Sequence, residues 1–148
     1  PTDGMDNNEK SGLWFLDLSS GSPMTSLNLP VLPAGWTYEG WAVINGTPVT
    51  TGTFLSNDGD DDSAPYSGNM SAPPFPGEDF IVNAPTGLNF PTDLSGGMAV
   101  ISVEPVPDNS PAPFLLKPMV GNIPADAQDH ITYSLNGNLN FPSGTATK

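Results

Sequence analysis

The sequence contains no cysteine and no arginine, and its three basic residues are all lysines. The lack of cysteine excludes disulfides, Cys-ligated zinc and thiol catalysis. Three lysines cannot form the basic surface that DNA or RNA binding requires, so nucleic acid is excluded as a partner and phosphate ligands are disfavoured. The chain also lacks an apolar run near the ~18 residues of a membrane span, so we expect no transmembrane helix.

The charge that is present is almost all negative. The 148 residues include 16 aspartates and glutamates, which gives a formal net charge of −13 at pH 7. An acidic surface poor in lysine and rich in Ser, Thr, Asn and Pro indicates an exported protein. The chain begins at Pro1, which fits either a mature form without its signal peptide or a shortened chain. We therefore expect an extracellular or cell-surface location.

Proline and glycine are abundant, with 18 and 16 copies. Both residues break helix interiors, so a helical bundle is excluded. Hydrophobic residues still make up 36% of the chain, which is enough for a packed core. At this length we expect one domain, over 12–141, between a polar arm, 1–11, and a polar tail, 142–148.

The clearest local pattern lies at 36–54. Residues of the first half alternate between two faces, Asn45-Gly46 follows, and alternation resumes on the return segment. Because Asn-Gly is the preferred dipeptide of a type I′ turn, this pattern predicts a β-hairpin. The apolar run at 98–105 predicts a buried strand. The core residues expected from these strands are Trp36, Tyr38, Ile44, Ile101 and Val103.

Shorter segments complete the fold prediction. We expect strands at 12–18, 79–85 and 114–120, a second Asn-Gly hairpin at 131–141, and one helical turn within 122–130. About seven or eight short strands without an amphipathic helix predict an all-β fold. An antiparallel β-sandwich with long Pro/Gly-rich loops is the expected architecture, because two apolar sheet faces can bury each other.

Two segments resemble a known family. YEGWAVINGTPVTTGTF at 38–54 resembles a strand pair in the outer domain of anti-sigma-K-type factors, and MAVISVEPVPDNSPAP at 98–113 resembles a later segment of that domain. The resemblance implies an extracytoplasmic β-sandwich. The chain lacks the family's His/Cys zinc element, basic sigma-binding helices and membrane helix. We therefore expect either an excised outer domain or a secreted protein that uses this fold alone.

An acidic run at 57–63 is the candidate metal site. Its carboxylates recur at every second position within a Gly-containing turn, and hard oxygen ligands at this spacing suit Ca²⁺. Ser63 stands where an EF-hand loop requires glycine, so the run is not an EF-hand. The alternative is a solvated acidic loop. The candidate calcium ligands are Asp58, Asp60, Asp61 and Asp62, with Glu78 and Asp79 closing the site from the far end of the loop.

Four aromatic residues, Trp14, Trp36, Tyr38 and Trp41, have two interpretations. Exposed on one sheet face, they could stack on sugars as in a carbohydrate-binding module; otherwise they belong to the core. Strand alternation places Trp36 and Tyr38 on one face and Trp41 on the other, so only one group can form a platform.

Lys117 is the one lysine inside an apolar strand-like segment. A buried ammonium needs a carboxylate partner, for which Glu104 and Glu39 are the candidates. We expect a buried Lys117–Glu104 ion pair. The alternatives are a Lys–Asn isopeptide crosslink and an edge lysine whose ammonium reaches solvent.

Nothing in the sequence marks a catalytic site. His130 is the only histidine, and no Ser-His-Asp pattern surrounds it. Paired carboxylates for glycoside hydrolysis are available among the acids, but no pair stands out. We therefore expect no enzyme activity. Sequons at 45–47 and 69–71 could carry glycans, although the first is more simply a hairpin turn.

The remaining hypothesis is protein–protein contact. Segment 12–18 is apolar, and a Pro-rich stretch, 19–35, is long enough to let it reach the open sheet edge of a neighbouring molecule. The alternative is that it folds back onto its own domain. We expect a non-catalytic, self-associating module; the alternatives are a filament subunit built by terminal strand exchange and a carbohydrate-binding module. The expected interaction residues are Leu13, Trp14, Phe15 and Leu16.

Overall fold

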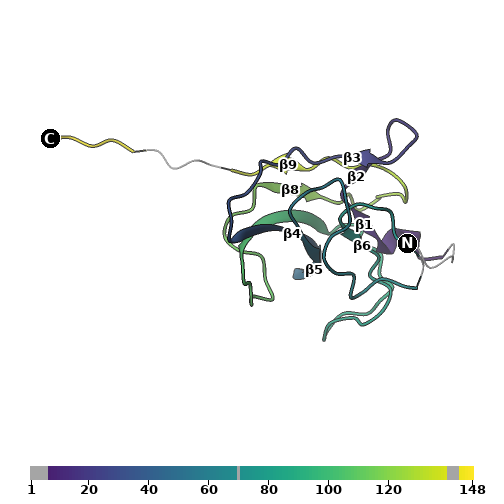
Figure 1. The fold of residues 1–148 in the computed structure, drawn as a ribbon. Helices are drawn as coiled ribbons and strands as arrows, with labels where there is room; N and C mark the ends of the chain where they lie inside the picture. Colours follow the sequence, from purple (N-terminus) through teal and green to yellow (C-terminus); the bar gives the residue numbers. More distant parts are fainter. Residues whose placement is uncertain (1–6, 70, 140–143) are drawn as a thin grey trace.

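The structure, a computed structural model, describes residues 7–69, 71–139 and 144–148 (Figure 1). Over these ranges the chain is all-β, as predicted, with antiparallel strands and one 3₁₀ turn, η1 (Glu9–Ser11), but no α-helix. Nor does any helix in these ranges reach the length and apolarity that crossing a membrane requires. The strands are β1 (Leu13–Trp14), β2 (Leu16–Asp17), β3 (Met24–Thr25), β4 (Trp36–Ile44), β5 (Thr47–Phe54), β6 (Gly77–Glu78), β7 (Met98–Pro105), β8 (Met119–Asn122) and β9 (Asn136–Gly137).

A five-stranded antiparallel sheet in the order β5-β4-β7-β8-β9 forms the centre of the molecule. β4 and β5 make the predicted hairpin, and Asn45 and Gly46 at its turn have φ of 52° and 82°. Positive φ at both central residues is the requirement of a type I′ turn, which explains the Asn-Gly pair. β4 also pairs with β7 over eight residue pairs, from Trp36 opposite Pro105 to Val43 opposite Met98.

One face of this sheet is apolar. Alternation places Tyr38, Ala42 and Ile44 of β4 on that face, opposite Val103 and Ala99 of β7. Short ladders and loops cover the face: β1 pairs with β6, and β2 pairs with β3. The covering layer contributes four side chains to the core, which are Phe15, Leu27, Phe80 and Leu94. The result is a sandwich-like arrangement in which the second layer is mostly irregular.

The opposite face of β4 and β7 is polar, and it is buried as well. Thr37, Glu39 and Trp41 of β4 lie beside Ser102 and Glu104 of β7 on this side. All five are less than 9% exposed. We call this side of the sheet the polar face.

Gly40 allows the N-terminal segment to pack closely on the apolar face. A Cβ at this position would lie 2.5 Å from Cε2 of Phe15 and still closer to Oγ1 of Thr51. The Phe15 ring, 2% exposed, therefore occupies the space of a side chain that Gly40 lacks. Phe15 also contacts Phe54, with ring centroids 6.4 Å apart, so this packing joins the covering layer to the hairpin.

The prediction that Trp36 belongs to the core is wrong. Its side chain is 37% exposed, whereas the other four expected core residues are buried. Trp36 is the first residue of β4, where the covering layer ends. Its ring lies instead against Phe114, with centroids 6.1 Å apart.

Several predicted element boundaries are also wrong, each for a local reason. Phe80 and Asn83 have φ of 49° and 56°, so the strand expected at 79–85 does not form; the neighbouring strand, β6, is Gly77–Glu78. Pro118 has no N–H to donate, so the strand expected at 114–120 begins only at Met119. No helical turn forms within 122–130: Asn122 ends β8, and turns follow at 125–126 and 129–130.

The second Asn-Gly pair does not form a turn. Asn136–Gly137 is β9, which pairs with Met119 and Val120 of β8. Apolar residues on either side of β9 are exposed to solvent: Ile131 is 56% and Leu139 43% exposed. Phe141, expected at the end of this hairpin, lies outside the described residues.

The expected polar arm belongs partly to the domain. Residues 1–6 lie outside the described part of the chain, but Ser11 is 1% exposed and donates to the Asp79 carbonyl oxygen at 2.8 Å. Of the expected tail, residues 144–148 are described, and they are exposed and lie away from the body (Figure 1).

Replacing Gly40 by Ala should destabilise the protein by about 1–3 kcal/mol, because the new methyl group collides with Phe15 and Thr51. Urea denaturation measures the loss. Gly59→Ala is the matched control, since a Cβ there meets nothing within 4 Å. Equal stability of the two variants would contradict the packing described for Phe15.

Candidate functional site

Two of the predicted calcium ligands at 58–62 are held by hydrogen bonds to neighbouring segments of the chain. Asp61 Oδ2 accepts a hydrogen bond from the Gly77 N–H at 2.9 Å. Asp62 accepts hydrogen bonds from the N–H and the hydroxyl of Thr53 at 2.7 and 2.8 Å. These two carboxylates fasten the loop to β6 and β5. The other two, Asp58 and Asp60, are exposed.

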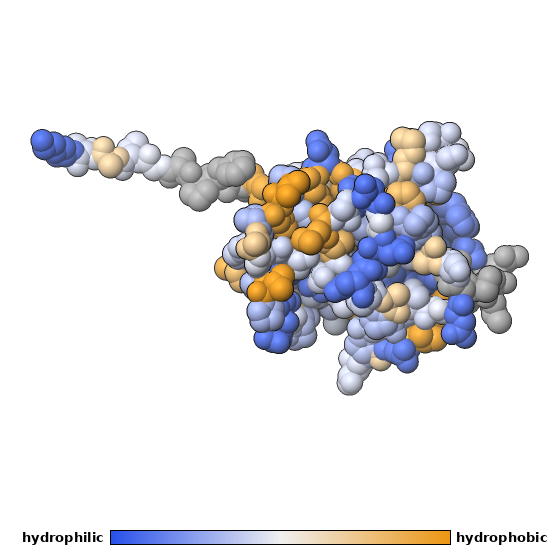
Figure 2. Space-filling model, viewed as in Figure 1, coloured by the Kyte–Doolittle hydropathy of each residue, from blue (hydrophilic) through white to orange (hydrophobic). Residues whose placement is uncertain are grey.

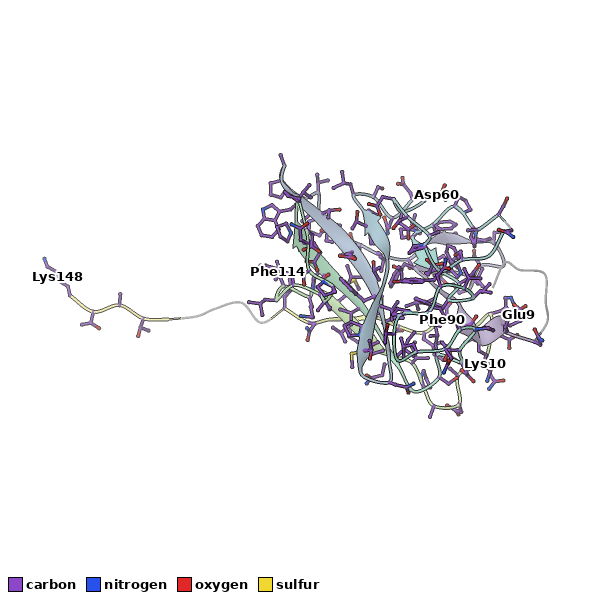
Figure 3. All side chains as sticks on the ribbon, turned by 90° about the horizontal axis from the view of Figure 1, so that it is seen from below. Glu9, Lys10, Asp60, Phe90, Phe114 and Lys148 are labelled. Atoms are coloured by element: carbon purple, nitrogen blue, oxygen red, sulfur yellow. The ribbon has the colours of Figure 1, made fainter. Side chains whose placement is uncertain are left out.

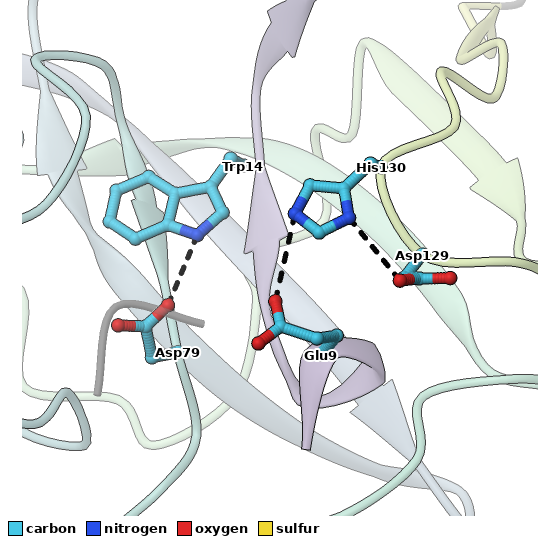
Figure 4. A network of polar contacts seen from close by, with 5 residues as sticks. All are labelled: Glu9, Trp14, Asp79, Asp129 and His130. Carbon is cyan, nitrogen blue, oxygen red and sulfur yellow. Dashed lines mark hydrogen bonds and ion pairs between the residues drawn. The ribbon is translucent and has the colours of Figure 1, made fainter. Parts of the chain in front are cut away.

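Glu78 and Asp79, predicted to close that site, are buried hydrogen-bond acceptors. The Glu78 carboxylate accepts from the Tyr66 N–H at 3.0 Å, from the Asp79 N–H at 2.9 Å and from the Ser67 hydroxyl. Asp79 Oδ1 accepts from Trp14 Nε1 at 3.2 Å (Figure 4). In the described part of the chain, no three of the predicted ligands converge, so the structure does not assemble this ligand set.

A different set of carboxylates does converge. Glu39 of β4, Glu104 of β7 and Asp108 in the following loop each place one oxygen within 4.8 Å of the other two. Glu39 pairs with Ser102 and Glu104 with Thr37, so the two glutamates are diagonal neighbours on the polar face. They are 7% and 0% exposed, and Asp108 is half-buried. We call this set the carboxylate triad.

Glu39 and Asp108 are each held through one oxygen. The Thr50 hydroxyl donates to Glu39 Oε1 at 2.5 Å, and the Ser110 N–H donates to Asp108 Oδ1 at 3.0 Å. Burial raises the pKa of Glu39 to about 7; the Thr50 hydrogen bond opposes this rise, and the charges of Glu104 and Asp108 add to it. Glu39 therefore exchanges its proton near neutral pH.

Glu104 is held inside a chain of polar contacts. Trp41 Nε1 donates to Ser102 Oγ at 2.8 Å, and the Ser102 hydroxyl donates to Glu104 Oε1. The Phe114 N–H donates to the same oxygen at 2.8 Å. The second oxygen, Oε2, is buried and has no hydrogen-bond partner. A buried acceptor without a hydrogen-bond partner raises the free energy of the folded state, so Glu104 Oε2 is an unfavourable feature of the fold as described.

The predicted Lys117–Glu104 ion pair is wrong. Lys117 Nζ donates to the carbonyl oxygens of Phe114 at 2.6 Å and Pro113 at 3.5 Å, and it forms no ion pair with a described carboxylate. The physical reason is that 113–117 is a loop rather than a strand, so Lys117 is not directed at the polar face. The triad consequently has no ammonium partner among the described residues.

The aromatic residues considered for sugar stacking do not form a common exposed platform. Tyr38 and Trp41 are 1% and 2% exposed, whereas Trp36 is exposed. Trp14 is half-buried, and its indole N–H is bound to Asp79.

His130 lies on the surface beside two acids. Its Nδ1 is 3.3 Å from Asp129 and its Nε2 is 3.6 Å from Glu9, and the imidazole is 69% exposed (Figure 4). A groove of about 630 Å³ runs beside it, between 12–18 and 128–135. No serine hydroxyl of the described residues is hydrogen-bonded to His130.

Segment 12–18 folds back onto its own chain, which is the alternative to strand exchange. Its two short strands pair with β6 and β3. Between them, the Phe15 N–H donates to the Pro76 carbonyl at 2.9 Å, and the Phe15 ring lies in the core. The residues expected to exchange, Leu13, Trp14, Phe15 and Leu16, are therefore packed in the described molecule itself.

Exposed apolar side chains gather where β4 begins and β7 ends. Trp36 and Phe114 are in ring contact there, and Val106, 58% exposed, follows the last residue of β7. Leu115 is 90% exposed and Leu116 45%. We call these five residues the apolar end patch.

The apolar end patch lies far from the N-terminal turn. Phe114 and Glu9 are at opposite ends of the molecule in Figure 3. Hydrophobic side chains also gather on the side from which the C-terminal tail leaves the body in Figure 2. The sequence predicted a strand at 114–120. The signal that could have corrected this is Pro118, which together with Pro111 and Pro113 indicates a loop.

Comparisons with known proteins identify no relative of this chain. No family model matches it, and neither does any curated protein or solved structure. The resemblance of 38–54 and 98–113 to anti-sigma-K-type factors therefore stays a prediction. In the structure these segments are the β4–β5 hairpin and β7 with its following loop, which are neighbours in the central sheet.

We predict that the free energy of unfolding falls as the pH rises from about 4 to about 7. Burial raises the pKa of Asp61 to about 7. The hydrogen bond from the Gly77 N–H lowers this pKa, whereas the negative charges of Glu78, Asp62 and Asp60 raise it further. The folded state therefore keeps a proton that the unfolded chain loses in this window, and Glu39 acts in the same direction. Because Asp61 is only partly buried, solvent screening reduces the combined change to about 1–3 kcal/mol.

Urea denaturation at pH 5 and pH 8, in the presence of a chelator, measures this change. Asp61→Asn should reduce the pH dependence, because it removes the titrating group and keeps an acceptor for Gly77. Asp126→Asn, on an exposed turn, serves as the control. A stability that rises between pH 5 and pH 8 would contradict the prediction.

Proposed function

We propose that this chain is a non-catalytic protein-binding module that works outside the cytoplasm and self-associates through the apolar end patch. The observation that carries the proposal is the exposure of large apolar side chains at one place, above all Leu115 at 90% and Val106 at 58%. Several large apolar side chains exposed at one end of a molecule are typical of interaction sites. The extracytoplasmic location rests on the acidic, lysine-poor composition.

The chemistry of the patch suits a protein partner. Trp36 and Phe114 present two rings in contact, and exposed aromatic residues supply much of the binding energy at protein interfaces. None of the five patch residues is charged, so burying them removes no ionised group from water.

A second copy of the chain is the proposed partner. Two copies carry a charge of −13 each and repel one another, but the patch residues themselves are uncharged, so contact through them pairs no like charges directly. Contact of the same patch on both copies would generate a two-fold dimer. Because salt screens the repulsion, association should strengthen as ionic strength rises, whereas binding to a basic partner would weaken.

Terminal strand exchange is the alternative route to assembly. It would have to remove Phe15 from its place over Gly40. Addition of a strand to β5 is also hindered, since Pro48 lies on that strand and Asp62 occupies the Thr53 N–H. These contacts favour the apolar end patch over the sheet edge as the interface.

Sedimentation or light scattering over a range of protein and salt concentrations tests the proposal. We expect a concentration-dependent dimer that is favoured by salt and weakened at least tenfold by Trp36→Ala or Leu115→Ser. Val82→Ser, an exposed apolar residue whose N–H is bound to the Tyr66 carbonyl, is the control and should leave association unchanged.

A monomer at every concentration and salt level would refute self-association. Association that persists in both patch variants would refute the patch as the interface and favour strand exchange.

A further inference from the structure

We propose that Glu39, Glu104 and Asp108 form a calcium-binding site on the polar face. The inference does not depend on self-association. Two observations carry it: three carboxylate oxygens lie within 4.8 Å of one another, and Glu104 Oε2 is buried without a hydrogen-bond partner. A cation at the triad would give that oxygen the partner that the described protein atoms do not.

The triad is arranged as a set of ligands with one oxygen fixed and one available on each carboxylate. Glu39 Oε1 is held by Thr50, and Asp108 Oδ1 is held by the Ser110 N–H. Glu104 Oε1 accepts both hydrogen bonds of that side chain, from the Ser102 hydroxyl and the Phe114 N–H. The remaining oxygens make no hydrogen bond with described residues, so each side chain is oriented without being saturated.

The charge of the triad, when all three carboxylates are ionised, favours a counterion. Three carboxylates this close repel one another strongly, most of all where two of them are withdrawn from water. The nearest lysine in the loop, Lys117, donates to the Phe114 and Pro113 carbonyls instead. No ion pair of the described residues reaches the triad, so a bound cation would supply the compensating charge.

The ligand chemistry selects calcium. All three donors are carboxylate oxygens, which hard divalent cations prefer. Two oxygens on opposite sides of Ca²⁺ are about 4.6–5.2 Å apart, and on opposite sides of Mg²⁺ about 4.0–4.2 Å. Oxygens within 4.8 Å of one another can therefore all reach one Ca²⁺ ion, whose coordination shell tolerates unequal ligand positions, whereas magnesium demands near-octahedral geometry. Waters at the half-buried Asp108 would complete the shell.

Calcium would also link the loop after β7 to the sheet. Asp108 belongs to that loop, while Glu39 and Glu104 belong to adjacent central strands. Further along the same loop, the Phe114 N–H is already bound to Glu104. A cation held by all three residues would fasten the loop at a second point.

Terbium luminescence and thermal unfolding test the site in the intact chain. Trp41 is two hydrogen bonds away from Glu104, through Ser102, so indole excitation should sensitise a Tb³⁺ ion at the triad, and calcium should displace it. Calcium at ten times its dissociation constant should raise the melting temperature by about 3–6 °C. Magnesium should raise the melting temperature less than calcium does, and KCl of equal ionic strength should not raise it to this extent.

The variants separate this site from the acidic loop. Glu104→Gln and Asp108→Asn should each weaken calcium binding at least tenfold. Because Asp108 is a loop residue, Asp108→Asn should leave the fold intact. Asp58→Asn/Asp60→Asn, a double change at exposed loop carboxylates, is the matched control and should bind as the unaltered protein does. The proposal is overturned by the absence of a calcium-specific shift, by unchanged binding in Asp108→Asn, or by loss of binding in the loop variant.

Discussion

The pairing of β4 with β7 is the constraint on which the rest of the structure depends. Eight residue pairs in one register send Tyr38, Ala42 and their partners to an apolar face and send Glu39, Ser102 and Glu104 to the other. Both faces are buried. The apolar face accepts the covering layer because Gly40 leaves room for Phe15. The polar face, in contrast, holds carboxylates that must find hydrogen bonds or a cation where water is excluded.

The β4–β5 hairpin, β7 and the all-β class could be predicted from the sequence, because a turn dipeptide and strand alternation are local signals. The same reasoning gave a turn at Asn136–Gly137, where the chain instead pairs with β8. A dipeptide sets only a preference, and tertiary pairing decides whether it is used. Trp36 was misplaced for a related reason: its side chain follows the alternation, but the covering layer ends before it.

The candidate site was less predictable than the fold. The acids at 58–62 suggested a metal site because they are clustered in the sequence, yet the structure uses two of them to fasten a loop. The triad has no local signature, since Glu39 and Glu104 come from separate strands and meet only through the β4–β7 register. Lys117 could not be excluded as a partner from the sequence, because its direction depends on where Pro118 ends the loop.

The most direct test of the carboxylate triad as a calcium site is a titration followed by backbone amide NMR. The account predicts that calcium shifts the amide signals of Phe114 and Ser110 most, because these N–H groups donate to the fixed oxygens of Glu104 and Asp108. The Gly77 amide, bound to Asp61, should change little. Largest shifts at Gly77 and in 58–62, with Phe114 and Ser110 unchanged, would contradict the account.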